Sequence, residues 1–114
     1  MIVLNLPLPP SVNSYRTIFH NRMGISKAGK VFKAQVSDYV VEYKVPKLGN
    51  ARLEMKVVLY PRDRRKQDID NRIKALWDAL GDAGVFDDDE QIDVLVIDRG
   101  EITKGGGCLV LIDI

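Results

Sequence analysis

Two aspartates separated by one residue, Asp68 and Asp70, form the segment of this chain best suited to chemistry. Lys74 follows four residues after Asp70, and a second acidic run, Asp87 to Glu90, comes after a turn that contains two glycines. Neighbouring carboxylates repel one another, so such a cluster usually binds a cation or shares a proton. Magnesium prefers oxygen ligands and is commonly held by one or two carboxylates together with a substrate phosphate. The pattern therefore indicates metal-assisted chemistry on a phosphodiester.

The charges of the chain divide by position, although the net charge is only +1. Residues 1–66 contain 13 Lys or Arg and 4 Asp or Glu, a net charge of +9, whereas residues 67–114 contain 4 and 12, a net charge of −8. Such asymmetry suggests a basic surface for a polyanion beside an acidic metal site. The alternative is that folding interleaves the two halves into a mixed surface.

Each acidic or basic group of the cluster also has a simpler interpretation. Asp70 could cap a helix that begins near Ile69, but that role leaves Asp68 unexplained. Lys74 could be a surface partner of Asp70, a phosphate contact, or a group that stabilises charge on the phosphate being cut. Within the run Asp87 to Glu90, one or two side chains at most could reach one metal ion, because a linear run cannot direct four carboxylates to one point.

The scarcity of cysteine and histidine excludes several other chemistries. The single cysteine, Cys108, rules out an intrachain disulfide and fits a reducing compartment, and its apolar surroundings predict a place in the core. The single histidine, His20, rules out a zinc site built on several His or Cys ligands. We expect a cytoplasmic protein with no membrane partner, because the start lacks a basic region with an uninterrupted apolar core and no run approaches transmembrane length.

The segment 16–33 combines basic with aromatic side chains, a mixture that suits bent or single-stranded nucleic acid. A solvated loop is the alternative on this segment alone. The basic residues are Arg16, His20, Arg22, Lys27, Lys30 and Lys33, with Tyr15 and Phe19 among them.

At 114 residues the chain has the length of one domain, which we expect to cover residues 1–114. Ser26 is a plausible N-cap, and apolar residues at helical spacing predict a helix to about Lys44. Strict alternation of apolar and charged residues predicts a half-buried strand over 53–59. The predicted order is a strand at 1–6, a long loop or loose hairpin at 11–25, the helix at 26–44, the strand at 53–59, a helix at 69–80, a strand at 92–98, a glycine turn at 103–107 and a strand at 108–114.

This order, β-loop-α-β-α-β-β, predicts the α/β (α+β) class, with a small mixed sheet and two main helices. The last two strands follow one another across the glycine turn, so we expect them to pair as a hairpin.

Four segments of the chain, in this order, resemble the RusA family of Holliday junction resolvases. They are residues 9–16 (PPSVNSYR), residues 68–71 (DIDN) with Lys74, residues 84–92 (GVFDDDEQI) and residues 103–106 (TKGG). The resemblance spans nearly the whole chain. It implies a small homodimeric, Mg²⁺-dependent endonuclease that resolves four-way DNA junctions by paired symmetric incisions in recombination and repair. Members are often encoded by phages or prophages.

The resemblance also implies roles for particular residues. The catalytic groups would be Asp68, Asp70, Asp89 and Lys74, and the three carboxylates would bind the metal. Asp89 is selected over Asp88 because it stands two residues before Gln91. Relatives often carry a basic residue immediately before the first catalytic aspartate, where this chain has Gln67. The residues expected to bind DNA are Asn13, Arg16, Arg22, Lys27, Lys30, Arg65 and Lys66.

Two other functions fit the same residues. One is a catalytically inert or non-junction-specific DNA-binding protein of the same fold, and the other is a general structure-specific or restriction-like nuclease. The chain retains the whole acidic set together with Lys74, which favours an enzyme.

Overall fold

The computed structural model describes the backbone of residues 1–12, 16–19 and 22–114 and the side chains of residues 1–12 and 24–114. These residues form a small mixed sheet and two main helices, which confirms the predicted α+β class. The elements, in chain order, are β1 (Ile2–Leu6), β2 (Arg16–Phe19), β3 (Arg22–Ile25), α2 (Lys27–Glu42), β4 (Leu53–Tyr60), α3 (Ile73–Asp82), the short 3₁₀ helix η1 (Asp89–Gln91), β5 (Ile92–Arg99) and β6 (Gly107–Asp113).

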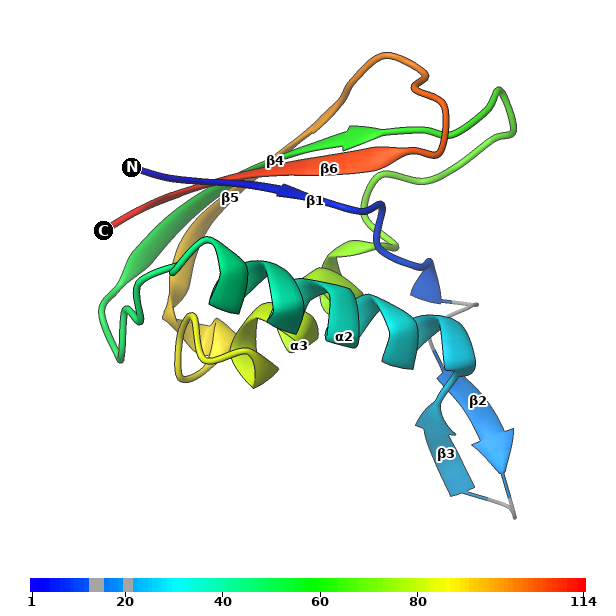
Figure 1. Ribbon diagram of the computed structural model, residues 1–114. Helices are drawn as coiled ribbons and strands as arrows, with labels where there is room; N and C mark the ends of the chain where they lie inside the picture. Colours follow the sequence, from blue (N-terminus) through cyan, green and yellow to red (C-terminus); the bar gives the residue numbers. More distant parts are fainter. Residues whose placement is uncertain (13–15, 20–21) are drawn as a thin grey trace.

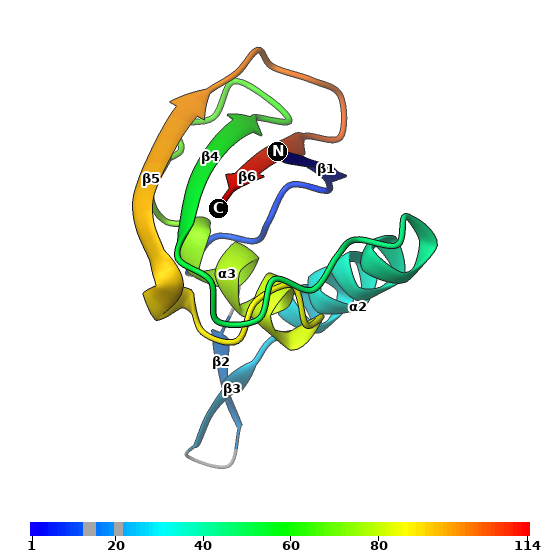
Figure 2. The ribbon, with the colours of Figure 1, turned by 90° about the vertical axis from the view of Figure 1, so that its left-hand side faces the viewer.

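The main sheet has the strand order β1-β6-β4-β5. Strand β6 is antiparallel to both of its neighbours, whereas β5 runs parallel to β4. A parallel pair needs a crossover, and α3 supplies it between β4 and β5. Helices α2 and α3 cover the same face of the sheet (Figure 1), and the sheet curves around α3 (Figure 2).

The prediction that the last two strands pair as a hairpin was wrong. Strands β5 and β6 lie on opposite sides of β4 and each pairs with it. The connection between them is bound to the end of β4, because Gly100 N–H donates to Leu59 O at 2.8 Å and Thr103 N–H donates to Pro61 O at 2.8 Å. The predicted glycine turn is present within this connection, where Gly106 has a φ of +73° and its N–H donates to Thr103 O.

The core lies between the helices and the inner face of the sheet. Along β4, Leu53, Met55 and Val57 are buried while the residues between them are exposed, as the alternation predicted. Each such side chain contributes roughly 1.5–3 kcal/mol by leaving water. Cys108 is also buried, as predicted, and this burial raises the pKa of its thiol to about 12, so the thiol is inert at neutral pH.

Helix α2 begins where its sequence predicts. The Ser26 side-chain oxygen accepts a hydrogen bond from Gly29 N–H at 3.1 Å, and the helix ends at Glu42, two residues before the predicted end. Its apolar stripe, with Phe32, Val36 and Val40 buried, faces the core. Among the described residues, neither helix is long and apolar enough to cross a bilayer.

The segment predicted as a loop or loose hairpin contains a hairpin. Strands β2 and β3 pair antiparallel, from Arg16 opposite Ile25 to Phe19 opposite Arg22. The hairpin projects away from the main sheet beyond the N-terminal end of α2 (Figure 1).

Helix α3 begins at Ile73, four residues later than predicted. The predicted start at Ile69 was wrong because the backbone before the helix is bound elsewhere: Asn71 O accepts from Val12 N–H at 2.7 Å. Arg72, and not Asp70, occupies the N-cap position, without a capping side chain. The helix passes through Gly81, and Gly84, with a φ of +84°, follows its end.

Candidate active site

The two aspartates of the acidic motif lie on the segment that joins β4 to α3. Both Asp68 and Asp70 are exposed, and no Lys or Arg among the described residues lies within salt-bridge distance of either. The next side chain, Asn71, has a buried oxygen that accepts no hydrogen bond from any described group. This segment therefore presents oxygen atoms that form no ion pair or, at Asn71, no hydrogen bond with the described residues.

The start of the chain is bound to this segment at two points. Val12 N–H donates to Asn71 O at 2.7 Å, and the Arg72 guanidinium donates to Pro9 O at 2.5 Å. Two of the four segments that carry the family resemblance are therefore in direct contact, although about 60 residues separate them in sequence.

Lys74 projects from the first turn of α3 towards two carboxylates. Its Nζ lies 3.0 Å from Asp78 Oδ1 and 3.4 Å from Asp89 Oδ2. The hydrogen bond that Lys74 donates to Asp78 and the charges of both carboxylates raise the pKa of Lys74 above its ordinary value. The suggested pairing of Lys74 with Asp70 was wrong, because α3 begins only after Asp70 and the i,i+4 partner of Lys74 is Asp78.

These residues line a groove of about 290 Å³ beside α3, called here the acidic groove. Its charged lining residues in the described part of the chain are Lys74, Asp78, Asp82, Asp87, Asp88 and Asp89. Asp82 at its far end is paired with Lys33 at 2.5 Å. Lys74 is the one cation among the described lining residues, and it is shared between two carboxylates.

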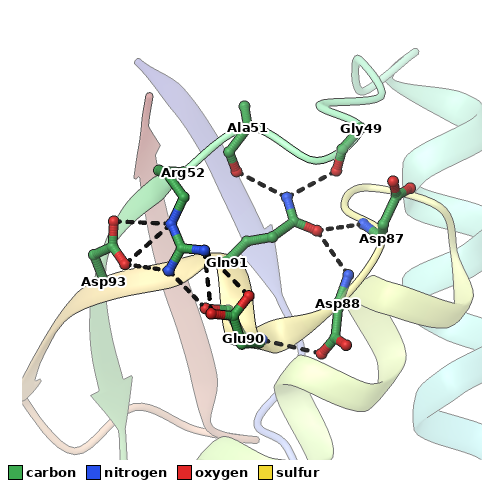
Figure 3. Close-up of polar contacts among 8 residues, drawn as sticks. All are labelled: Gly49, Ala51, Arg52, Asp87, Asp88, Glu90, Gln91 and Asp93. Carbon is green, nitrogen blue, oxygen red and sulfur yellow. Dashed lines mark hydrogen bonds and ion pairs between the residues drawn. The ribbon is translucent and has the colours of Figure 1, made fainter.

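A buried glutamine fixes the loop that carries Asp89. The Gln91 side-chain oxygen accepts from the backbone N–H groups of Asp87 and Asp88 at 2.9 and 2.7 Å. Its side-chain nitrogen donates to Gly49 O and Ala51 O, both at 2.8 Å (Figure 3). With only 4% of its surface exposed, Gln91 ties the acidic loop to the chain that enters β4.

The other acids of the run have separate roles. Asp88 caps η1, and the hydrogen bond from Glu90 N–H lowers the pKa of the Asp88 carboxyl. Arg52 forks between Glu90 and Asp93 (Figure 3), and this bonding lowers the pKa of Asp93 and raises that of Arg52. Asp89 is therefore the member of the run that faces Lys74.

The donor set suits a hard cation only in part. Asp68, Asp70 and the orphaned Asn71 oxygen supply the oxygen atoms that Mg²⁺ prefers, and Mg²⁺ commonly needs only one or two carboxylates beside phosphate and water. In the part of the chain that the structure describes, no three His, Cys, Asp or Glu side chains gather closely enough to hold one metal ion. A metal bound here would be completed by substrate and water.

Four of the residues expected to bind DNA have described side chains. Lys27 and Lys30 are exposed in the first turn of α2, and Arg65 and Lys66 are exposed on the loop after β4. Arg65 is paired with Asp63 at 2.7 Å. Asn13 and the side chains of Arg16 and Arg22 lie outside the described residues.

Sequence reasoning missed three residues of the site, Asp78, Gln91 and Arg72. The spacing of Asp78 from Lys74 was a signal that could have found the first. Gln91 and Arg72 act through backbone partners far away in sequence, at Gly49 and Pro9, and no local pattern marks such contacts.

Comparison with known proteins identifies one family over most of the chain. The family model "Endodeoxyribonuclease RusA" matches residues 7–110. A crossover junction endodeoxyribonuclease of Enterobacteria phage HK97 is 36% identical over 101 residues, which cover 89% of this chain and 84% of that protein. Crossover junction endodeoxyribonucleases of Shigella sonnei and Escherichia coli K12 are 33% and 32% identical over 104 residues, covering 90% of this chain and 86% of each relative.

The fold and site thus define a small α+β protein of the nuclease class. The chain belongs to the endodeoxyribonuclease RusA family.

Proposed function

We propose that this protein is a Holliday junction resolvase that hydrolyses phosphodiester bonds of four-way DNA junctions with Mg²⁺. The observation that carries the proposal is the match to the RusA family over residues 7–110, a range that contains the acidic set and Lys74. We also predict that it acts in the cytoplasm.

The catalytic roles follow from the chemistry of phosphodiester hydrolysis. The family resemblance assigns Asp68, Asp70 and Asp89 to Mg²⁺, and because these three side chains do not gather closely enough in the structure to hold one ion, substrate phosphate and water would complete its coordination. When bound, the ion supplies an activated water and neutralises charge on the phosphate. Lys74 would stabilise the charge that develops on the phosphate oxygens, a role supported by its position beside Asp89 at 3.4 Å. Its raised pKa keeps the ammonium charged at neutral pH, as that role requires.

The resemblance further suggests that the active unit is a two-fold homodimer, the commonest closed assembly of identical chains. Each protomer would then cut one of two opposed strands. A heterodimer of wild-type and Asp70→Asn chains should nick a cruciform plasmid, whereas the wild-type dimer should linearise it. A strictly monomeric protein that still linearises cruciforms would contradict the dimeric unit.

The decisive experiment uses purified protein with Mg²⁺ on a synthetic mobile four-way junction, with a linear duplex and a fork as controls. We expect symmetric nicks across the junction and little cutting of either control. Asp70→Asn should lower cleavage about 10²-fold or more while junction binding persists, because the change removes one charge from the metal site and keeps the shape. Binding without cleavage by the wild type would instead identify an inert DNA-binding protein, and equal cutting of all three substrates would identify a nuclease without junction specificity.

A further inference from the structure

A cleft of about 520 Å³ opens on the other side of the acidic motif, called here the basic cleft. It lies between the Pro10–Ser11 segment, the loop after β4 and the start of α3. Four of its lining side chains are cationic: Arg62, Arg65, Lys66 and Arg72. None of the described residues that line it is acidic.

Arg72 is the best-fixed cation of this cleft. Its guanidinium donates to Gln67 Oε1 at 2.6 Å and to Pro9 O at 2.5 Å, and both acceptors are neutral. No carboxylate among the described residues lies within salt-bridge distance of Arg72, and the side chains of 13–23 include no Asp or Glu.

Other well-ordered cations of the protein differ from Arg72 in this respect. Arg52 is forked between Glu90 and Asp93, Lys33 is paired with Asp82, and Lys74 lies between Asp78 and Asp89. Within the cleft itself, Arg65 is neutralised by Asp63. Arg62, Lys66 and Arg72 form no ion pair with a described carboxylate, although Arg62 is close enough to Asp63 to help lower the pKa of that carboxyl.

We propose that the basic cleft binds a backbone phosphate of the DNA, with Arg72 as its central donor and Arg62 as the second cation. The proposal rests on the proposed function, since the phosphate belongs to the substrate of that site. A guanidinium has five N–H donors in a planar fork, so donors remain for phosphate oxygens after the bonds to Gln67 and Pro9. Those two bonds hold the fork in one orientation, which reduces the side-chain entropy lost when phosphate binds.

The position of the cleft suggests that a phosphate bound there positions the DNA strand for cleavage. Arg72 follows Asp70 by two residues, and its bond to Gln67 spans the Asp68–Asp70 segment from the other side. A phosphate bound at Arg72 would therefore seat the strand beside the exposed aspartates. Because these aspartates repel phosphate, a fixed cation next to them lets the strand approach before any metal is present.

The test measures junction binding without cleavage, by fluorescence anisotropy in EDTA at several salt concentrations. Arg72→Gln should weaken binding about tenfold and reduce the slope of log K against log salt by about 0.9. Arg62→Gln should reduce the slope by a similar amount; it should leave the fold intact because Arg62 is exposed and forms no hydrogen bond or ion pair with a described residue. The matched control is Lys44→Gln, which lies two residues beyond the C-terminal end of α2; that helix has 16 residues and is therefore about 24 Å long. The control variant should change neither quantity.

The outcomes separate this inference from the proposed function. A wild-type protein that cuts junctions, combined with unchanged affinity and slope in both arginine variants, overturns the phosphate site and leaves the function standing. A wild-type protein that binds DNA through Arg72 and Arg62 but never cuts supports the phosphate site and overturns the resolvase. A wild-type protein that binds no DNA overturns both. If Arg72→Gln melts well below the wild type, the Arg62→Gln slope decides the result.

Discussion

The basic cleft includes Arg72 at the N-cap of α3, the acidic groove includes Lys74 in its first turn, and the charged residues of the two hollows differ in their partners. In the cleft, Arg72 is oriented by neutral oxygens and keeps its full charge for a ligand. In the groove, the one described lining cation, Lys74, is shared between Asp78 and Asp89. The cleft is therefore suited to attract phosphate, and the groove can accept it only when a further cation offsets its carboxylates.

This difference also shows what the charge asymmetry along the sequence means. The basic half ends at residue 66 and the acidic half begins at residue 67, yet the cleft draws Arg72 from the acidic half. The cleft is lined by Gln67 and Asn71, which flank Asp68 and Asp70 in the sequence, and the groove begins at Lys74. The charges that we expect to act on DNA are thus those that line the cleft and the groove near α3, and the net charge of each half of the sequence does not describe them.

The largest expected effect tests the chemistry of the groove. Asp89→Asn should lower the single-turnover rate of junction cleavage about 10²-fold or more, because it removes the carboxylate beside Lys74 and from the proposed metal site. Asp88→Asn is the matched control and should be milder, because Asp88 is engaged in capping η1. Equal losses in the two variants would remove the distinction drawn between these neighbours.

The next effect tests whether Gln91 holds the loop that carries Asp89 in place. Gln91→Met keeps the size of the side chain but removes four partly buried hydrogen bonds between the Gln91 amide and the backbone, so the free energy of unfolding should fall by about 2–4 kcal/mol. Urea denaturation followed by circular dichroism measures this change. Gln35→Met, at an exposed position of α2, is the control and should change stability little. A stable Gln91→Met protein would show that the loop holds itself in place.

A smaller effect tests how far the basic surface extends beyond the cleft. Lys27 and Lys30 are exposed next to Ala28, which lines the cleft. Replacing both by Ala should weaken junction binding a few-fold and reduce the salt slope by about 0.9 for each DNA phosphate that the protein no longer neutralises. Anisotropy titrations over a range of salt concentrations measure both quantities. An unchanged slope would confine phosphate binding to the cleft.

The smallest effect concerns the protonation of Lys74. The hydrogen bond to Asp78 raises the pKa of Lys74, so Asp78→Asn should move this pKa back towards its ordinary value. A group with a raised folded-state pKa stabilises the protein below its unfolded pKa, and that stability is lost as pH rises through the folded pKa. The variant should therefore lose this contribution below the unfolded pKa, and its stability should converge with that of the wild type as alkaline pH passes through the folded pKa.

An NMR titration of the lysine ¹³Cε resonance measures the change at Lys74. Asp82→Asn, which removes a groove carboxylate paired with Lys33, is the matched control and should leave the Lys74 pKa unchanged. An equal shift in both variants would mean that Lys74 responds to the field of the whole groove and to no single partner.

Much of the fold was predictable because its signals are local. The cap at Ser26, the apolar stripe of α2 and the alternation along β4 each depend on residues within one or two turns of the chain, and each was found where the sequence placed it. The burial of Cys108 followed from its apolar neighbours in the same way. The acidic motif and Lys74 were likewise visible as residue types at particular spacings.

Contacts between distant segments were decided only by the tertiary structure. Periodicity shows that β5 and β6 are strands but carries no information on their neighbours, so only the folded sheet placed β4 between them. The bonds of Lys74 to Asp89, of Gln91 to Gly49 and of Arg72 to Pro9 join residues 15, 42 and 63 positions apart. Such contacts depend on how the helices and strands pack, so they cannot be predicted from the sequence around each residue. The sequence by itself determined which groups this protein has for its chemistry, and the packing of α3 against the sheet and the first segment decided which of them meet.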